Sequence, residues 1–336
     1  MRFRLLFFSI VLAITMIGCL GDSNQVILYT SFDQIYSEPI VKDFEKATGI
    51  KVKAVYDSEA TKTVGLVNRL IAEKKNPQAD VFWNNEMGRT IVLKNKGILT
   101  PYMSPQAKEI PGGFKDMKGY WTGFAARARV LIYNTKLVPE NQVPQTLADL
   151  RKPQWKGKVA MANPLFGSTA THFAALWTLW GAEETKKYCQ ALKANGVVLV
   201  DGNSVVRDKV GAGEYPIGLT DTDDANSGML GGMPVKMIFL DQGEGQIGTF
   251  VMPNTVCLIK NGPNPKNGQK LIDYLLSPEV ESKLAKSETI QIPLHQGLKI
   301  TGGLAIDDIR AMPVDFVKVG ANLETSSRFL QELLVR

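Results

Sequence analysis

The fold is set by QVILYT at residues 25–30 and by the polar SFDQ at residues 31–34 that follows it. The first segment has the length and apolar content of a short buried strand, and the second is typical of a loop. The apolar positions after this loop recur at helical spacing: Ile40, Val41, Phe44 and Ala47. Ser37 is placed to cap this helix and Gly49 to end it. The stretch therefore predicts one strand–loop–helix unit.

The residues that follow repeat this order. Residues 50–56 and 79–83 are further strand patterns, and a helical pattern that includes Val67 and Leu70 lies between them. A strand–helix–strand order predicts mostly parallel sheets with right-handed crossovers, and hence an α/β fold. Ligands of such sheets bind beyond the carboxyl ends of the strands. The polar loops at those ends are therefore the first place to look for a site.

A second lobe begins near Trp121. Residues 125–133 read as one long strand that could cross between the lobes. Shorter strand patterns and two return strands follow it: 159–162, 197–200, 217–219, 248–251 and 255–259. Ser277 and Pro278 are the expected start of a late helix, because proline is tolerated at the first helical position. We expect residues 19–122 and 250–336 to form the first lobe and residues 123–249 the second.

The first eighteen residues have the pattern of a secretory signal. A basic start at residues 1–4 precedes an apolar run at residues 5–17, and a glycine stands directly before Cys19. The run falls short of the roughly 20 apolar residues that span a bilayer. The cysteine at the cut resembles a bacterial lipobox, so we expect Cys19 to be lipidated. The mature protein would then be exported to the periplasmic side of the cell membrane and held there by a lipid anchor only.

Composition and charge exclude several classes of protein. Removing residues 1–18 takes away Arg2 and Arg4 and no acid, which lowers the formal charge from +6 to +4. This small excess forms no nucleic-acid patch, and we expect no nucleic-acid partner. Cys189 and Cys257 lie in apolar periodic segments and are expected to be buried free thiols. The sequence has no Cys/His metal spacing.

Enzyme patterns are weak in this sequence. The glycine spacing of residues 243–248 matches a dinucleotide loop, but a strand pattern follows where the pyrophosphate would need a helix. Ser168 and His172 lie four apart without a nucleophile elbow or an acidic partner. The acidic loop at residues 221–224 alone is a weak sign of a hydrolase. We therefore expect no catalysis and no cofactor. A purely structural lipoprotein is a third class, which the convergence of polar loops disfavours.

Several short segments, taken in order, resemble one known family. They are ILYTSFD (27–33), FEKATGIKV (44–52), ADVFWNNE (79–86), YNTKLVP (133–139), LRKPQWKGKVAMANP (150–164) and LIDYLLSPEVESKLA (271–285). Together they resemble the ferric-ion-binding branch of the solute-binding proteins of ABC importers. The resemblance implies a two-lobed, type II periplasmic-binding-protein fold with a hinge of crossing strands. It also implies a ligand in the cleft, closure about the hinge and an ABC permease as partner; we expect a monomer.

The resemblance also implies a metal site, from which this sequence departs. Ferric binders carry two adjacent tyrosines where this chain has Asp223 and Asp224. An acidic ligand after the third strand is retained as Glu86, so these three residues are the expected metal ligands. Carboxylates are hard oxygen donors that suit a hard cation. Ferric iron or an iron chelate is thus the first expected cargo, with Tyr29 or Tyr56 as alternative phenolate donors.

A second interpretation is an organic anion or zwitterion. The helix starts at Ser168 and Asn203 offer free N–H groups and polar side chains to an acid group, and Arg127 or Arg129 adds positive charge. Asp223 and Asp224 would take an amine, as in an aminophosphonate. The plainer alternative is that the serines only cap helices. Ten residues are the predicted ligand contacts: Ser31, Asp33, Glu86, Arg127, Asn163, Ser168, Thr169, Asn203, Ser204 and Asp221.

Overall fold

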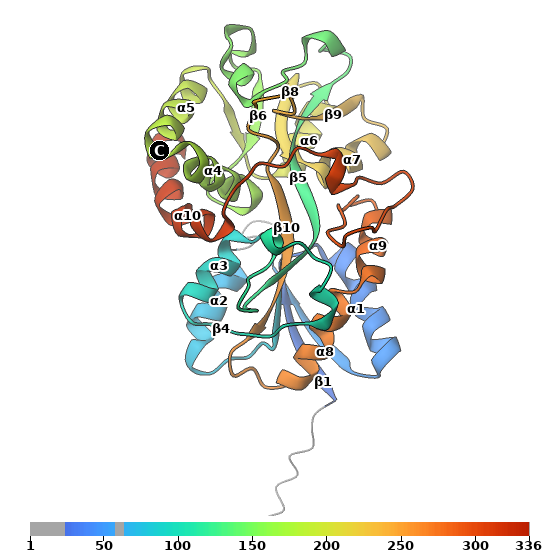
Figure 1. Ribbon diagram of the computed structural model, residues 1–336. Coiled ribbons are helices and arrows are strands. Elements are labelled where there is room, and N and C mark those ends of the chain that lie inside the picture. Colours follow the sequence, from blue (N-terminus) through green and yellow to red (C-terminus); the bar gives the residue numbers. More distant parts are fainter. Residues whose placement is uncertain (1–23, 58–63, 336) are drawn as a thin grey trace, which may run out of the picture.

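The computed structural model describes residues 24–57 and 64–335, and they form two lobes stacked along one axis (Figure 1). Four strands lie in the lower lobe: β1 (Gln25–Thr30), β2 (Lys51–Tyr56), β3 (Val81–Asn84) and β4 (Leu99–Thr100). Four lie in the upper lobe: β6 (Val159–Ala162), β7 (Val198–Val200), β8 (Ile217–Asp221) and β9 (Val235–Phe239). Two long strands run through both lobes: β5 (Thr122–Asn134) and β10 (Val251–Ile259). The predicted signal and Cys19 lie outside the described residues.

The sheet is mixed rather than mostly parallel. Its strand order is β2-β1-β3-β10-β5-β8-β6-β7, with β4 beside β10 and β9 beside β5. β1 is parallel to β2 and β3, and β6 is parallel to β7 and β8. β10 is antiparallel to β3 and to β5, and β5 is antiparallel to β8. These two strands carry the chain from one lobe to the other and back. The two-lobed α/β fold is confirmed.

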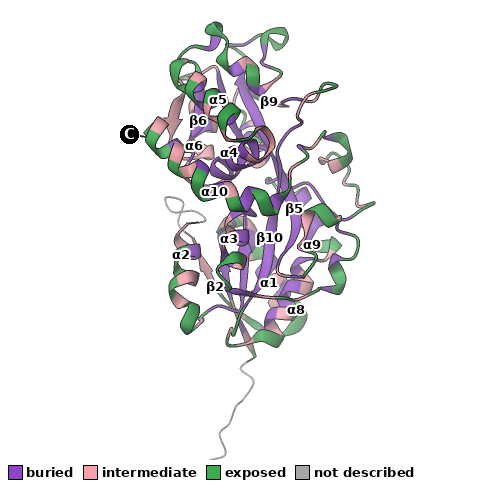
Figure 2. Cartoon of the chain, turned by 60° about the vertical axis from the view of Figure 1, so that its left-hand side comes forward, coloured by how far each residue is buried: buried purple, intermediate pink, exposed green. Residues whose placement is uncertain are grey.

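Helices cover the sheet in both lobes (Figures 1 and 2). The lower lobe has α1 (Gln34–Thr48), α2 (Gly65–Ala72), α3 (Gly88–Asn95), α8 (Pro265–Leu275) and α9 (Pro278–Lys286). The upper lobe has α4 (Gly167–Trp180), α5 (Ala182–Ala194), α6 (Asn203–Gly211) and α7 (Thr222–Leu230). Short 3₁₀ turns occupy Glu73–Lys75, Pro105–Ala107, Gly112–Phe114, Glu140–Gln142, Leu147–Arg151, Pro153–Trp155 and Ile306–Asp308, and a π-helical turn Gln331–Val335.

The last long helix, α10 (Phe316–Leu330), belongs to neither lobe alone. It packs against α3 of the lower lobe and α4 of the upper lobe, and a Cβ at Gly320 would come within 2.4 Å of Ile91. Asn322 donates a hydrogen bond to Thr178 of α4. The assignment of residues 250–336 to the first lobe stays a prediction. Within this range, α10 contacts helices of both lobes.

Two helix starts show what local sequence can and cannot predict. Ser277 accepts a hydrogen bond from the Val280 N–H, and Pro278 is the first helical residue, as expected. Ser37, in contrast, lies inside α1, and its hydroxyl donates to the Asp33 carbonyl. The prediction that Ser37 caps the helix is therefore wrong. Gly49 does end it, with φ of 72° and its N–H on the Glu45 carbonyl.

The return strand and the cysteines complete the frame. The two predicted return strands are one strand, β10, with a register shift around Pro253, which has no N–H for the ladder.

Cys189 and Cys257 are buried and free, as predicted, and burial raises the pKa of Cys189 to about 12.

The passage of β5 between the lobes is held by a buried carboxylate. Ala125 has a φ of 43°, a conformation that side chains with a Cβ rarely adopt. Its N–H donates to Glu281 Oε1 at 2.6 Å, and its carbonyl accepts from Asn254 Nδ2. The same carboxylate accepts from the N–H groups of Leu294 and His295. Such strain persists only where the surroundings over-determine the backbone.

His295 should make stability depend on pH. Its Nδ1 lies 2.7 Å from Glu281 Oε2 and its Nε2 lies 2.9 Å from the Gln106 carbonyl, so both ring nitrogens face acceptors. Burial alone would lower the pKa of His295, but the hydrogen bond and charge of Glu281 raise it above 6.5. The stabilisation is therefore full below the unfolded pKa and is lost as pH rises through the folded pKa.

We expect His295→Gln to lower the free energy of unfolding by about 1.5–3 kcal/mol at pH 6, the value of a hydrogen bond to a charged group. At pH 9 the difference from the wild type should be smaller. Urea unfolding at both pH values measures it. A difference that does not change with pH would mean that the imidazole is neutral in the folded protein.

Candidate ligand site between the lobes

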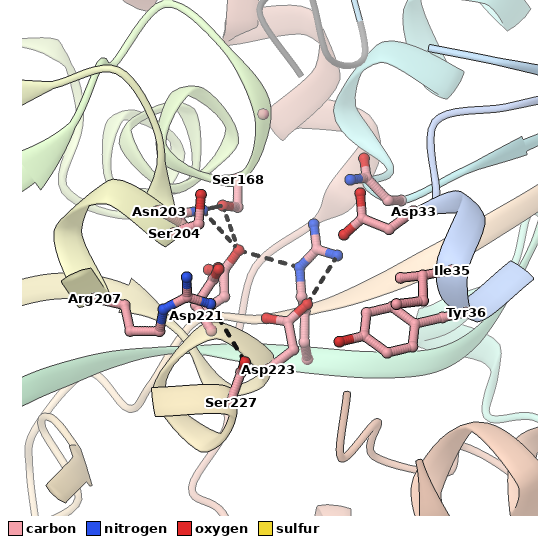
Figure 3. A pocket seen from close by; sticks show the side chains of 14 residues that line it. Asp33, Ile35, Tyr36, Ser168, Asn203, Ser204, Arg207, Asp221, Asp223 and Ser227 are labelled. Atoms are coloured by element: carbon pink, nitrogen blue, oxygen red, sulfur yellow. Dashed lines mark hydrogen bonds and ion pairs between the residues drawn. The ribbon is translucent and has the colours of Figure 1, made fainter. Parts of the chain in front are cut away.

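A cavity of about 270 Å³ lies between the lobes, at the carboxyl ends of the strands (Figure 3). The lower lobe lines it with the first turn of α1 and with Asn85, which follows β3. The upper lobe lines it with the starts of α4, α6 and α7. Strand-end loops of both lobes therefore meet at one place, as the sequence predicts.

Asp221 is the centre of a buried polar network. It is the last residue of β8 and is 2 % exposed. Arg129 Nη1 lies 2.7 Å from its Oδ1, and Arg127 Nε lies 3.2 Å from its Oδ2. Ser168 donates to Oδ2 at 2.6 Å and Asn203 at 3.0 Å. The two arginines share one face of β5, as their spacing of two predicts, and that face is buried.

The charges in this network stabilise one another. Burial alone would raise the pKa of Asp221, but Arg129 and Arg127 hold it below its ordinary value. Burial alone would likewise lower the pKa of Arg127, but Asp223, Asp221, Asp224 and Asp33 raise it. Arg127 and Asp221 are therefore both ionised at neutral pH.

Two helix starts point polar side chains at this centre. Ser168 is the second residue of α4 and Asn203 is the first of α6. Asn203 donates to Ser168 Oγ at 2.8 Å, and Arg129 Nη1 donates to both residues. Neither helix has a side-chain cap at its start. Ser168 is thus not a helix cap, and its hydroxyl donates to Asp221 instead.

Further acidic residues line the cavity beside Arg127 and Asp221. Asp223 and Asp224 lie in the first turn of α7, and one carboxylate oxygen from each lies within 4.8 Å of the others and of Asp221. Asp223 Oδ2 is 3.8 Å from Arg127 Nη1. Asp33, at the start of α1, faces them from the lower lobe (Figure 3). The cavity thus has a cationic wall beside an anionic one.

Eight of the predicted residues line this cavity: Asp33, Arg127, Ser168, Asn203, Ser204, Asp221, Asp223 and Asp224. Four do not. Ser31 hydrogen-bonds to Asn84 and Asn85 and so supports the wall from behind. Asn163 accepts from the Leu165 N–H in a turn, and Thr169 is buried in α4.

Glu86 is the fourth, and the structure does not bring it to Asp223 and Asp224. Its carboxylate accepts from the N–H groups of Gly88 at 2.6 Å and Arg89 at 2.9 Å, at the start of α3. Thr171 of α4 donates to the same carboxylate at 2.8 Å. Glu86 therefore holds a helix start and joins the lobes behind the cavity.

Sequence reasoning missed several lining residues, above all Tyr36, Arg207 and Ser227. Tyr36 lies on the first turn of α1, three residues after Asp33, so helical spacing from that aspartate could have indicated it. The tyrosines that the sequence suggested lie elsewhere: neither lines the cavity, and the Tyr29 hydroxyl donates to Glu73. Arg207 donates to Ser227 Oγ at 3.3 Å and so links α6 to α7.

Comparisons with known proteins agree with the fold. The model of the bacterial extracellular solute-binding protein family matches residues 39–295. The chain belongs to this family. It is therefore a solute-binding protein of the ABC import type. In the part of the chain that the structure describes, no helix has the length and apolar character needed to cross a membrane.

Its relatives carry different ligand names. It is 25 % identical over 325 residues to iron uptake protein A1 of Synechocystis, covering 93 % of this chain and 88 % of that protein. It is 29 % identical over 194 residues to the Fe(3+)-binding periplasmic protein of Serratia marcescens, 58 % of this chain and 56 % of that one. It is 26 % identical over 245 residues to a putative 2-aminoethylphosphonate-binding periplasmic protein of Salmonella typhimurium, 72 % and 69 %.

Solved structures agree on the fold. The apo ferric ion-binding protein A of Pasteurella haemolytica superposes with a TM-score of 0.81 at 25 % identity, covering 92 % of this chain and 98 % of that one. The relatives described above are thus named for iron or for an aminophosphonate.

Proposed function

We propose that this protein captures a small zwitterionic solute in the cavity between its lobes and delivers it to an ABC permease, without catalysis. The observation that carries the proposal is the pairing of the two walls. One wall has Arg127 and the starts of α4 and α6, and the other has Asp223 and Asp224. A solute with an acid group at one end and an amine at the other complements both.

The charge balance of the cavity favours a positive group on the solute. Four carboxylates line the cavity, from Asp33, Asp221, Asp223 and Asp224, against the two guanidinium groups of Arg127 and Arg207. Asp221 is paired with Arg127 and Arg129, and Arg127 also lies 3.8 Å from Asp223, so the remaining excess of negative charge lies with Asp33, Asp223 and Asp224. An ammonium group there would form charge-assisted hydrogen bonds, which are about twice as strong as neutral ones.

The acid end has a separate place. N–H groups at the start of an α-helix attract anions, and the starts of α4 and α6 both line the cavity. Ser204 adds a hydroxyl, and Arg127 adds a full charge. The cavity volume of about 270 Å³ leaves room for a small metabolite.

Ferric iron with an accompanying anion is the second candidate. The three carboxylates within 4.8 Å of one another favour a hard cation, and several relatives are named for iron. It ranks second because Arg127 lies beside the same carboxylates, so a bare cation would need an anion between itself and the guanidinium. Glu86 also lies outside the cavity, and the tyrosine pair is replaced.

A thermal-shift series on residues 20–336 tests the proposal. The probes are 2-aminoethylphosphonate, phosphonoacetate, ethanolamine, and ferric citrate with and without phosphate. We expect a shift with the zwitterion that neither the anion nor the amine alone reproduces. A ligand at 100-fold its dissociation constant adds about 2.7 kcal/mol of stability. A shift with ferric citrate and none with any organic probe would reverse the order of the two candidates.

The proposed cellular location and oligomeric state rest on the signal pattern, the family and the position of the cavity. We infer export, lipidation at Cys19 and a periplasmic location at the cell membrane, supported by the signal pattern of residues 1–19 and by the family. A single polar cavity between two hinged lobes needs no second copy, so we propose a monomer that docks on the permease.

A further inference from the structure

One segment of the lower lobe reaches the upper lobe at the mouth of the cavity. Residues 287–295 follow α9 and run along the side of the molecule below α7 (Figure 1). The side-chain amide of Asn226, in α7, donates to the Glu288 carbonyl at 2.9 Å. The helix that carries Asp223 and Asp224 is thus bonded directly to the lower lobe.

The same segment is anchored at the passage of β5. Ile292 exchanges two backbone hydrogen bonds with Ala126, of 2.6 and 2.8 Å, directly after the strained Ala125. Leu294 and His295 bind the Glu281 carboxylate, which also holds the Ala125 N–H. Four residues after Glu288, the segment is therefore part of the hinge.

Between these two ends the segment is held firmly. Gln291 Oε1 accepts from Asn254 of β10 at 2.9 Å. Ile290 has a φ of 43°, which is costly for a β-branched residue and persists only where neighbours fix the backbone. The Tyr36 hydroxyl, which lines the cavity, lies 3.5 Å from the Glu288 carboxylate. A fixed segment transmits a displacement at one end to the other.

We infer that residues 287–295 are a closure strap that links α7 to the hinge, and that the Asn226–Glu288 hydrogen bond is its latch. The bond holds the lobes together on the side of the acidic wall. All the bonds of the strap are made within the chain, so the inference does not depend on which solute the cavity takes.

The test is the distance between the lobes in the ligand-free chain from residue 20 onward, which contains every described element. Spin labels at Lys53→Cys and Lys187→Cys occupy exposed sites, one on each lobe. The native thiols are buried and do not compete. Double electron–electron resonance then gives the closed and open populations.

We expect Asn226→Ala to lower the closed-to-open ratio about fivefold, the effect of losing one hydrogen bond of about 1 kcal/mol. Asn226→Asp should lower it further, because a carboxylate oxygen would face the Glu288 carbonyl. Alanine is a good helix former, so α7 stays intact. The matched control is Asn267→Ala, which removes a side-chain amide bond of 2.9 Å to the Gln25 carbonyl within the lower lobe. Equal distance distributions for Asn226→Ala, Asn226→Asp and the control would overturn the latch.

Discussion

Asp221→Asn is expected to abolish solute binding and to lower the free energy of unfolding by about 3–5 kcal/mol, the cost of breaking a buried ion pair. The carboxylate is 2 % exposed and stands between Arg129 at 2.7 Å and Arg127 at 3.2 Å. Asparagine keeps its shape but removes its charge, which leaves Arg129 buried without a counter-charge. Its amide N–H groups would also face guanidinium N–H groups.

Urea unfolding at pH 7 measures the loss, and Glu183→Gln on the exposed start of α5 is the control. That variant removes one acid from the same lobe and should change stability by less than about 0.5 kcal/mol. The lowered pKa of Asp221 gives a second signature, since its stabilisation is present above the unfolded pKa and is lost as pH falls through the folded one. The difference between wild type and variant should therefore shrink in strong acid. A loss below 1 kcal/mol at pH 7 would mean that the arginines do not depend on Asp221.

The strands of the fold were largely predictable from the sequence. The predicted strands at residues 25–30 and 159–162 coincide with β1 and β6, because a short apolar run flanked by loop residues is typical of a buried strand. The error at Ser37 arose because a serine near a helix start can bond forward to N–H groups or back to a carbonyl. In this chain the Ser37 hydroxyl donates to the Asp33 carbonyl. The spacing of apolar residues in a helix does not indicate which of the two bonds forms.

The upper lobe of the site was easier to predict than the lower lobe. Strand-end reasoning found Ser168, Asn203 and Asp221, since each stands where a helix start meets the cleft. The same reasoning placed Glu86 in the cleft, but the free N–H groups of α3 take up its carboxylate. Whether a polar residue serves its own helix or a ligand depends on loop conformation, which one sequence does not reveal. Tyr36 was missed because it lies on a helix rather than in a loop.

The double change Asp223→Asn with Asp224→Asn should weaken binding of a cation-bearing solute by at least about 100-fold. Each hydrogen bond to a charged group is worth about 1.5–3 kcal/mol, and the variant removes the charge from two. The fold should be less affected than in Asp221→Asn, because both residues are only partly buried at the start of α7 and Arg127 keeps Asp221 as a partner. Isothermal titration with the solute identified by the thermal-shift series measures the change.

The matched control is Glu183→Gln with Glu184→Gln, which removes two acids from the first turn of α5 in the same lobe. Glu183 pairs with the partly exposed Lys186 and Glu184 with the exposed Lys187, so the control has the same change in net charge without a change at the cavity. If the control weakens binding as much as the double aspartate variant, the acidic wall acts through long-range charge alone. If only the aspartate variant loses affinity for the solute, and it still binds phosphonoacetate as well as the wild type does, the amine of the solute binds at Asp223 and Asp224. That outcome would also give a role to the two carboxylates that stand where the resemblance implies tyrosines: they would bind an ammonium group in place of a metal.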